Sequence, residues 1–414
     1  MKSKMIIVLC LLYYCSAGLR GQAADIGKLI TDRLKDERIS LREQSNLRLG
    51  SMDYGLPFLE KVEVRTELDR MQTSRQEFML RTSFNGFGQK NAEKDKFNAL
   101  LARKNASALN IKNELLTEGY RDILEFVFVN LNKDLLKRYR SHLVEKEKLT
   151  ETLLANGVSP DLEDYIKLKE SILENQLRQQ SLDQKSKVYA EKLKMDTSAI
   201  INMADWPAPD HIYQHILSLE PDFETHAEVM NYDLESRFLT ADLNALRARN
   251  AKILDFAQIK HTLRDDLLLQ NRFSIGLGLN IPWSGSFHLK QQDIKIKQEE
   301  VAVEKEIEKL KLKSDFAHLK NLFYTELTQY QLWQSIHSDS LVIKLKEKVL
   351  QSGKLDPLKA FSLKDSELDA ASKSLEHYEK LYKIYISILE SSGELFRMPA
   401  KNYLHTLRPV LVDW

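Results

Sequence analysis

Two groups of residues have the spacing of known chemical sites. His211 and His215, in the sequence HIYQH, lie one helical turn apart, so that both imidazoles could bind one metal ion. The stretch 272–287, RFSIGLGLNIPWSGSF, is rich in glycine and includes Gly276 and Gly278, which could belong to a loop that binds phosphate before a helix. The two patterns would indicate a metalloprotein and a nucleotide-binding protein.

Neither pattern is complete. The histidine pair has no glutamate after its first histidine and no evident third ligand. A dinucleotide-binding loop would require glycine where Ile281 stands, and no glycine pair at phosphate-loop spacing is followed by lysine. No nucleophile, base and orienting group can be assembled either. We therefore expect no catalytic residues, no cofactor and no metal, and a protein that is not an enzyme. The net charge of +1 also argues against nucleic acid as a partner.

The N-terminal segment 1–23 has the layout of a secretory signal peptide. Lys2 and Lys4 precede an apolar run that is too short to span a membrane, and small residues follow with a cleavage site expected between 17 and 23. Cys10 and Cys15, the only two cysteines, both lie in this segment. The exported chain is therefore expected to contain no disulfide.

The rest of the chain repeats one plan. Phe87 and Trp283 are separated by 283 − 87 = 196 residues, and Gly157 and Gly353 by 353 − 157 = 196 residues. Two features that keep the same offset indicate an internal duplication. We predict a first structural repeat over 24–200, a linker over 201–225 that contains the sequence WPAP, a second repeat over 226–398, and a C-terminal tail over 399–414.

Each repeat is expected to contain a long helix, a tight turn and a shorter return helix. Apolar residues recur every seven positions in the second repeat, as in a coiled-coil seam. They are Leu289, Ile296, Val303, Leu310, Ala317 and Tyr324. We predict long helices over 89–156 and 286–351, and return helices over 160–195 and 357–396.

Two segments with a period of two precede each long helix, and we predict strands over about 61–71, 77–88, 257–266 and 271–283. Each has about the length of a tilted membrane-spanning strand, one apolar face and one polar or small face. Because long rod-like helices cannot cover a sheet face with a compact core, we expect the apolar faces to contact lipid. In the last strand the lipid-facing residues would be Phe273, Ile275, Leu277, Leu279, Ile281 and Trp283. Four strands cannot close a barrel, so several copies of the chain would be needed.

This order of elements resembles the plan of the TolC-like outer-membrane efflux proteins, or outer membrane factors. The sequences FSIGLGLNIPWSGSFHLKQQDIKIKQEE and FMLRTSFNGFGQKNAEKDK are similar to the family's strand, breaker and aromatic residue before a long helix. The resemblance implies a mainly α fold with a membrane β-barrel portion. A homotrimer would contribute four strands per protomer to one barrel, continuous with an α-helical tunnel through the periplasm.

The resemblance also implies a function. Such a protein is a passive exit duct in the cell outer membrane for a tripartite efflux pump or a type I secretion system. It docks by its helical tips to a periplasmic adaptor and an inner-membrane transporter of the RND or ABC type. Periodicity alone leaves an alternative open, an exported periplasmic or surface coiled-coil scaffold without channel activity.

At each helical tip the family has a glycine, and an acidic residue six positions later. Gly157 and Gly353 match the glycine and Glu163 matches the acid, but the second repeat has Lys359 there, a departure from a fully anionic constriction. Acids after a turn are also favoured by the helix macrodipole. The candidate tip and adaptor-docking residues are Gly157, Val158, Leu162, Gly353 and Leu358, and the candidate constriction residues are Asp161, Glu163, Asp164 and Asp356.

Overall fold

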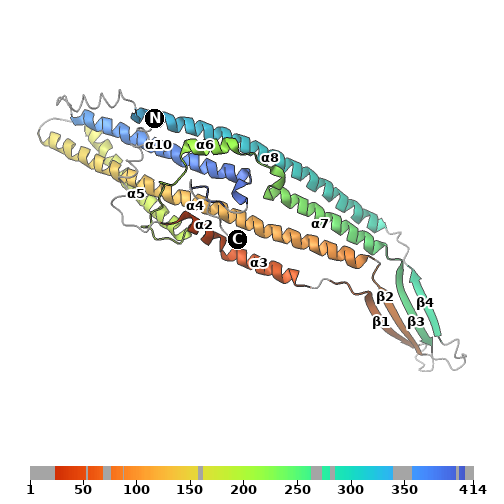
Figure 1. Cartoon of the computed structure of the whole chain (residues 1–414). Helices are drawn as coiled ribbons and strands as arrows, with labels where there is room; N and C mark the ends of the chain where they lie inside the picture. Colours follow the sequence, from red (N-terminus) through yellow and green to blue (C-terminus); the bar gives the residue numbers. More distant parts are fainter. Residues whose placement is uncertain are drawn as a thin grey trace. The chain divides into compact units, whose positions relative to one another are not determined.

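The computed structural model describes residues 24–52, 55–68, 76–86, 88–156, 162–262, 273–279, 285–338, 357–397 and 401–405. These residues form long helices and one four-stranded sheet (Figure 1). The helices are α2 (Ile26–Leu34), α3 (Glu37–Gly50), α4 (Gln89–Ala155), α5 (Leu162–Lys192), α6 (Pro209–Ser218), α7 (Ala227–Asn250), α8 (Gly285–Ser338) and α10 (Pro357–Ser391), with short 3-10 turns at Phe223–Thr225 and Glu394–Phe396. The strands are β1 (Leu59–Leu68), β2 (Gln76–Phe84), β3 (Leu254–Thr262) and β4 (Phe273–Leu279).

The order of these elements follows the duplication found in the sequence. The long helices α4 and α8 begin at Gln89 and Gly285, which are 285 − 89 = 196 residues apart. Each follows a pair of strands, and each precedes a shorter helix, α5 or α10. The predicted fold class, two repeats of a strand pair and long helices, is therefore confirmed.

The repeats do not form separate compact units. Unit 1 comprises residues up to 36, residues 112–222 and residues from 312 onwards, and unit 2 comprises residues 37–111 and 223–311. Each unit takes helices from both repeats, because α4 and α8 both continue from one unit into the other. The repeat is thus a unit of sequence, whereas each compact unit is built from both copies.

Unit 1 has a substantial hydrophobic core, which the sequence interpretation did not anticipate. The sequence LEFVFV in α4 is apolar except for Glu125, and Leu124, Phe126 and Phe128 are almost completely buried. They pack in one cluster with apolar side chains from α2, α6, α8 and α10. A helix segment with apolar residues on most of its sides requires several neighbouring helices, and these helices supply them.

The segment 201–225, which we predicted as a linker, contributes Ile201, Trp206, Ile212 and Ile216 to this core. Trp206 is 6% exposed, and its ring lies 5.0 Å from that of Tyr382 and 6.5 Å from that of Phe128. The Tyr382 hydroxyl donates a hydrogen bond of 2.8 Å to the Pro207 carbonyl. Pro209 then begins α6, where the missing N–H of proline costs nothing.

Part of the predicted C-terminal tail is also anchored in unit 1. The Tyr120 hydroxyl donates to the Lys401 carbonyl at 2.9 Å, and the Tyr403 hydroxyl donates to the Glu394 carbonyl at 2.8 Å. His215 lies beside this cluster, with Nδ1 3.1 Å from the Tyr385 hydroxyl, and burial lowers the pKa of its imidazole. His215 is therefore engaged by tyrosines of the core.

In unit 2 each strand is followed or preceded in the chain by one helix: α3 precedes β1, α4 follows β2, α7 precedes β3 and α8 follows β4. Polar contacts join α3 to α4 (Arg42 Nη2 to Ser107 Oγ, 2.8 Å), α4 to α7 (Arg103 to Glu235, 2.7 Å) and α7 to α8 (Lys305 to Asp233, 2.7 Å). The helix order α3, α4, α7, α8 therefore matches the order of the strands that follow or precede them in the chain, β1, β2, β3, β4.

Candidate functional site: a sheet with one apolar and one polar face

The four strands pair antiparallel in the order β1, β2, β3, β4. Residues that pair directly across the sheet lie on the same face, so the register defines each face. One row across all four strands consists of Val64, Leu80, Ile259 and Ile275. All four are aliphatic, and all four are exposed.

We call the face that contains this row the apolar face. Its large apolar side chains are between 41% and 79% exposed, the reverse of what a soluble hairpin packed on a core would show. They are Val62, Val64, Phe78, Leu80, Ile259, Phe273, Ile275, Leu277 and Leu279. Of the predicted lipid-facing residues, Phe273, Ile275, Leu277 and Leu279 lie on this face, whereas Ile281 and Trp283 lie outside the described residues.

The opposite face carries the charged and small residues, and we call it the polar face. The row next to the aliphatic one consists of Glu63, Arg81, Gln258 and Gly276. Glu63 pairs with Arg65 at 3.1 Å and with Lys61, while Lys260 of β3 pairs with Glu77 of β2. The charges of the polar face are thus largely compensated within the sheet itself.

A stack of side chains that the sequence did not indicate lies on the polar face. The Phe256 ring of β3 lies flat over Gly278 of β4, so that a Cβ added to Gly278 would be 2.1 Å from the ring. The Arg81 guanidinium of β2 lies over the same ring, 3.6 Å from its centroid. The only signal in the sequence was Phe256 itself, an aromatic residue at a position where the alternation expects a polar one. Gly278 is therefore needed for close packing.

Replacing Gly278 with valine is expected to lower the stability of the sheet by about 1–3 kcal/mol, the usual cost of overpacking. The Phe256 ring would have to rotate away and lose its contact with Arg81. The measurement is the temperature at which the purified, detergent-solubilised protein loses its folded mobility on a gel. Adding Phe256→Ala to Gly278→Val should recover much of the loss, because the clash needs both side chains. If the loss of stability in the double variant equalled the sum of the losses in the two single variants, this packing would be contradicted.

The predicted tip residues fall mostly outside the described residues, namely Gly157, Val158, Asp161, Gly353 and Asp356. Leu358 lies in α10. Leu162 begins α5 and is 69% exposed. Glu163 and Asp164 occupy the first turn of α5, and Glu163 pairs with Lys167 at 2.6 Å. Roles of these residues in docking or constriction remain predictions.

Four of the apolar heptad positions of α8 are exposed in the single chain. Leu289, Ile296, Val303 and Leu310 are 57% to 70% exposed. The side of α8 that packs against α7 instead contains Ile294 and Val301, which contact Leu239, Leu243 and Leu246. The helix therefore has two apolar stripes in unit 2, and among the described residues the second stripe is the one covered by its own chain.

In the described parts of the chain, none of the helices has both the length and the apolarity needed to cross a membrane.

Comparisons with known proteins identify the fold. No family model matches the sequence, and no curated protein sequence matches it. Solved structures match over nearly the whole chain. One match is CusC, in crystal structures that concern conformational changes accompanying folding and transmembrane channel formation. It is 13% identical to this chain, with a TM-score of 0.65, and the match covers 90% of this chain and 93% of CusC. The Campylobacter jejuni CmeC outer membrane channel is 12% identical, with a TM-score of 0.62 and coverage of 89% and 85%. The outer membrane protein VceC from Vibrio cholerae is 13% identical, with a TM-score of 0.59 and coverage of 90% and 97%.

Proposed function

We propose that this chain, which has the fold of outer-membrane efflux channels, is itself an outer-membrane channel and serves as a passive exit duct. The observation that carries the proposal is the apolar face, whose large side chains are exposed along all four strands. In water such a face would be an aggregation hazard, whereas in lipid it is the surface a transmembrane strand requires. The polar face would then line an aqueous lumen.

The sheet edges support an oligomer. β1 and β4 each pair on one side only among the described residues. Unpaired backbone groups in lipid cost several kcal/mol each, so both edges need partners. Because the sheet has an even number of strands, a rotated copy would place its β1 antiparallel to the first copy's β4, as a barrel requires. We propose a homotrimer, in which three four-stranded sheets form one barrel.

The remaining partners belong to the same proposal. CmeC and CusC are named as channels, and a channel of this fold needs an energy source for export. We propose that a periplasmic adaptor docks at the ends of the helical hairpins, near Leu162, and connects the duct to an inner-membrane transporter of the RND or ABC type. The helices would extend into the periplasm. This mode of action needs no catalytic residue in the chain.

The test is membrane association together with conductance. The native protein should remain in the membrane pellet after carbonate extraction and should conduct ions in a planar lipid bilayer. A soluble protein without conductance would contradict the proposal and would favour an exported coiled-coil scaffold. Comparing the protein extracted from the outer membrane with refolded protein separates a loss of activity during purification from a true absence of activity.

A further inference from the structure

The guanidinium of Arg81, on the polar face of the sheet, donates no hydrogen bond within the described parts of the chain. Its Nη2 lies 3.9 Å from Oδ2 of Asp255, which is too far for a hydrogen bond, and its Nε is buried without an acceptor. A guanidinium carries five N–H donors. The other described cations of this face each lie beside a glutamate, namely Lys61, Arg65 and Lys260. Arg81 differs from them in that its donors are unused.

The carboxylates nearest to Arg81 are engaged by other cations. Oδ1 of Asp255 lies 3.1 Å from the ammonium group of Lys252. Glu63, which pairs with Arg81 in the strand register, accepts a hydrogen bond of 3.1 Å from Arg65. Neither carboxylate is therefore free to neutralise Arg81, and its positive charge is available to a solute.

The side chain of Arg81 is nevertheless held in one position. Its guanidinium lies 3.6 Å from the centroid of the Phe256 ring, and that ring occupies the space above Gly278. Gln258 lies over Gly276 in the same way, since a Cβ added there would be 2.8 Å from its Nε2. An aromatic platform orders a guanidinium and leaves its N–H edges accessible. The side chain of Arg81 is 28% exposed, so a solute can reach these edges.

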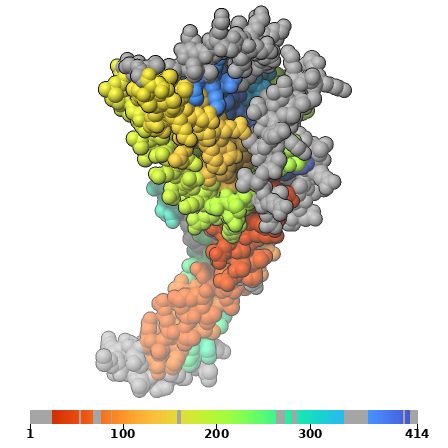
Figure 2. All heavy atoms as spheres, turned by 90° about the vertical axis from the view of Figure 1, so that its left-hand side faces the viewer, coloured from red at the N-terminus to blue at the C-terminus, as the bar shows by residue number. Residues whose placement is uncertain are grey.

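The backbone that carries Arg81 is also well supported. β2 is an inner strand, paired with β1 on one side and β3 on the other. The helices that adjoin β1 and β2 in the chain, α3 and α4, lie side by side in unit 2 (Figure 2). Two hydrogen bonds join them, from Arg42 to Ser107 at 2.8 Å and from Asn46 to the Lys104 carbonyl at 3.2 Å. Because both its strand and its ring platform are fixed, Arg81 needs little ordering to bind a ligand.

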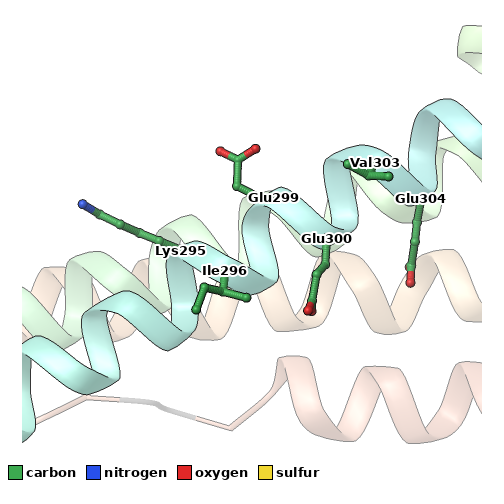
Figure 3. A pocket seen from close by; sticks show the side chains of 6 residues that line it. All are labelled: Lys295, Ile296, Glu299, Glu300, Val303 and Glu304. Atoms are coloured by element: carbon green, nitrogen blue, oxygen red, sulfur yellow. The ribbon is translucent and has the colours of Figure 1, made fainter.

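A second charged surface in unit 2 lacks this geometry. It is a shallow groove of about 550 Å³ on α8, whose acidic residues are Glu299, Glu300 and Glu304 (Figure 3). All three glutamates are exposed. Figure 3 shows Glu299 directed away from the side of the helix where Glu300 and Glu304 point. Since these carboxylates diverge, they do not converge on one ligand as the N–H donors of a single guanidinium do.

We propose that Arg81 is an oxyanion-binding site, and that it makes the duct favour solutes that carry a carboxylate or phosphate group. The inference rests on the proposed function, in which the polar face lines an aqueous lumen, and it names a class of solute. Carboxylate and phosphate oxygens match the two parallel N–H donors of a guanidinium. Each copy of the chain contributes one such site, and positive charge in a channel raises the local concentration of anions.

Ion selectivity tests the uncompensated charge. Arg81→Gln should lower the ratio of chloride to potassium permeability about threefold, because a charge that attracts anions is removed. The matched control is Glu77→Gln with Lys260→Gln, which removes a compensated ion pair from the same face and should leave the ratio unchanged. The reversal potential across a planar bilayer measures the ratio, at about 0.1 M salt, where charges act over about 10 Å. Equal ratios in the wild type and in Arg81→Gln would overturn the proposal.

Variants that conserve charge test the binding of oxyanions. Inorganic phosphate should lower the chloride preference of the wild-type channel with a saturating dependence, because a bound phosphate neutralises Arg81. In Arg81→Lys, which keeps the charge but loses the planar fork and its stacking, the phosphate concentration for half the effect should rise about fivefold. Lys260→Arg is the control and should behave as the wild type. An equal rise in both variants would contradict a site at Arg81.

A second series with potassium acetate distinguishes a site for carboxylates from a site for phosphates, and saturation by either anion supports the proposal. A wild-type channel that conducts ions but responds to neither anion would reject the oxyanion site and leave the duct intact. Wild-type protein without conductance would reject the proposed function itself. Heat-modifiable mobility on a gel shows whether each variant is folded, and Arg81→Lys provides the test if Arg81→Gln does not fold.

Discussion

Replacing Leu277 with arginine is expected to prevent the protein from assembling in the outer membrane. Leu277 is 67% exposed, lies in the centre of β4 and belongs to the apolar face. An arginine on the lipid face of a membrane barrel costs about 2–4 kcal/mol near the midplane. Every copy in an oligomer would carry the change, so the cost is multiplied by the number of protomers. The amount of heat-modifiable, carbonate-resistant protein in purified outer membranes measures the effect.

The matched control is Ser274→Arg. Ser274 is on the same strand but on the polar face, opposite Lys260. An arginine there would face the proposed aqueous lumen, so assembly should proceed nearly as in the wild type and only the ion selectivity of the channel should change. If Leu277→Arg assembled as well as Ser274→Arg, the apolar face would not be in contact with lipid. If both variants failed, the sheet would be buried on both faces.

The two faces of the sheet were predictable because a strand has a side-chain period of two. In an extended strand the backbone fixes the face that each residue occupies. The alternation therefore places Phe273, Ile275 and Leu277 on one face, and Ser274 and Gly276 on the other. The heptad pattern and the lack of glycine and proline from Ser286 onwards predicted a long helix from residue 286, and α8 begins at Gly285. These features depend on local geometry. A single sequence contains enough information to derive them.

Long-range packing could not be derived in the same way. Trp206 in the sequence WPAP has the local signature of a stiff connection, yet its ring packs against Tyr382, which is 176 residues away (382 − 206 = 176). The Phe256 and Gly278 contact also depends on strand register, which period alone does not fix. On α8 the sequence shows two apolar stripes, one with Ile294 and one with Ile296. The periodicity does not indicate which of these two stripes packs against another helix of the same chain.

The same long-range packing predicts that Phe128→Ala will strongly destabilise unit 1. Phe128 is completely buried in α4, and its ring lies 5.9 Å from Tyr378, 6.0 Å from Tyr382 and 6.5 Å from Trp206. Truncating a phenylalanine in such a core costs about 3–5 kcal/mol, because the cavity closes only partly. Guanidinium chloride unfolding, followed by tryptophan fluorescence, should show a lower midpoint, since Trp206 itself reports on the site.

Two further variants make this prediction specific to packing. Leu154→Ala removes an apolar side chain from the same helix, but Leu154 is 43% exposed, so its cost should stay within about 0.5 kcal/mol. Phe128→Leu keeps most of the volume and should recover more than half of the stability lost in Phe128→Ala. If Phe128→Ala and Leu154→Ala unfolded at the same denaturant concentration, the aromatic cluster would not be what joins α4 to α10. The helices of unit 1 would then depend on their ion pairs, such as Glu125 with Lys383, and their stability should fall steeply with added salt.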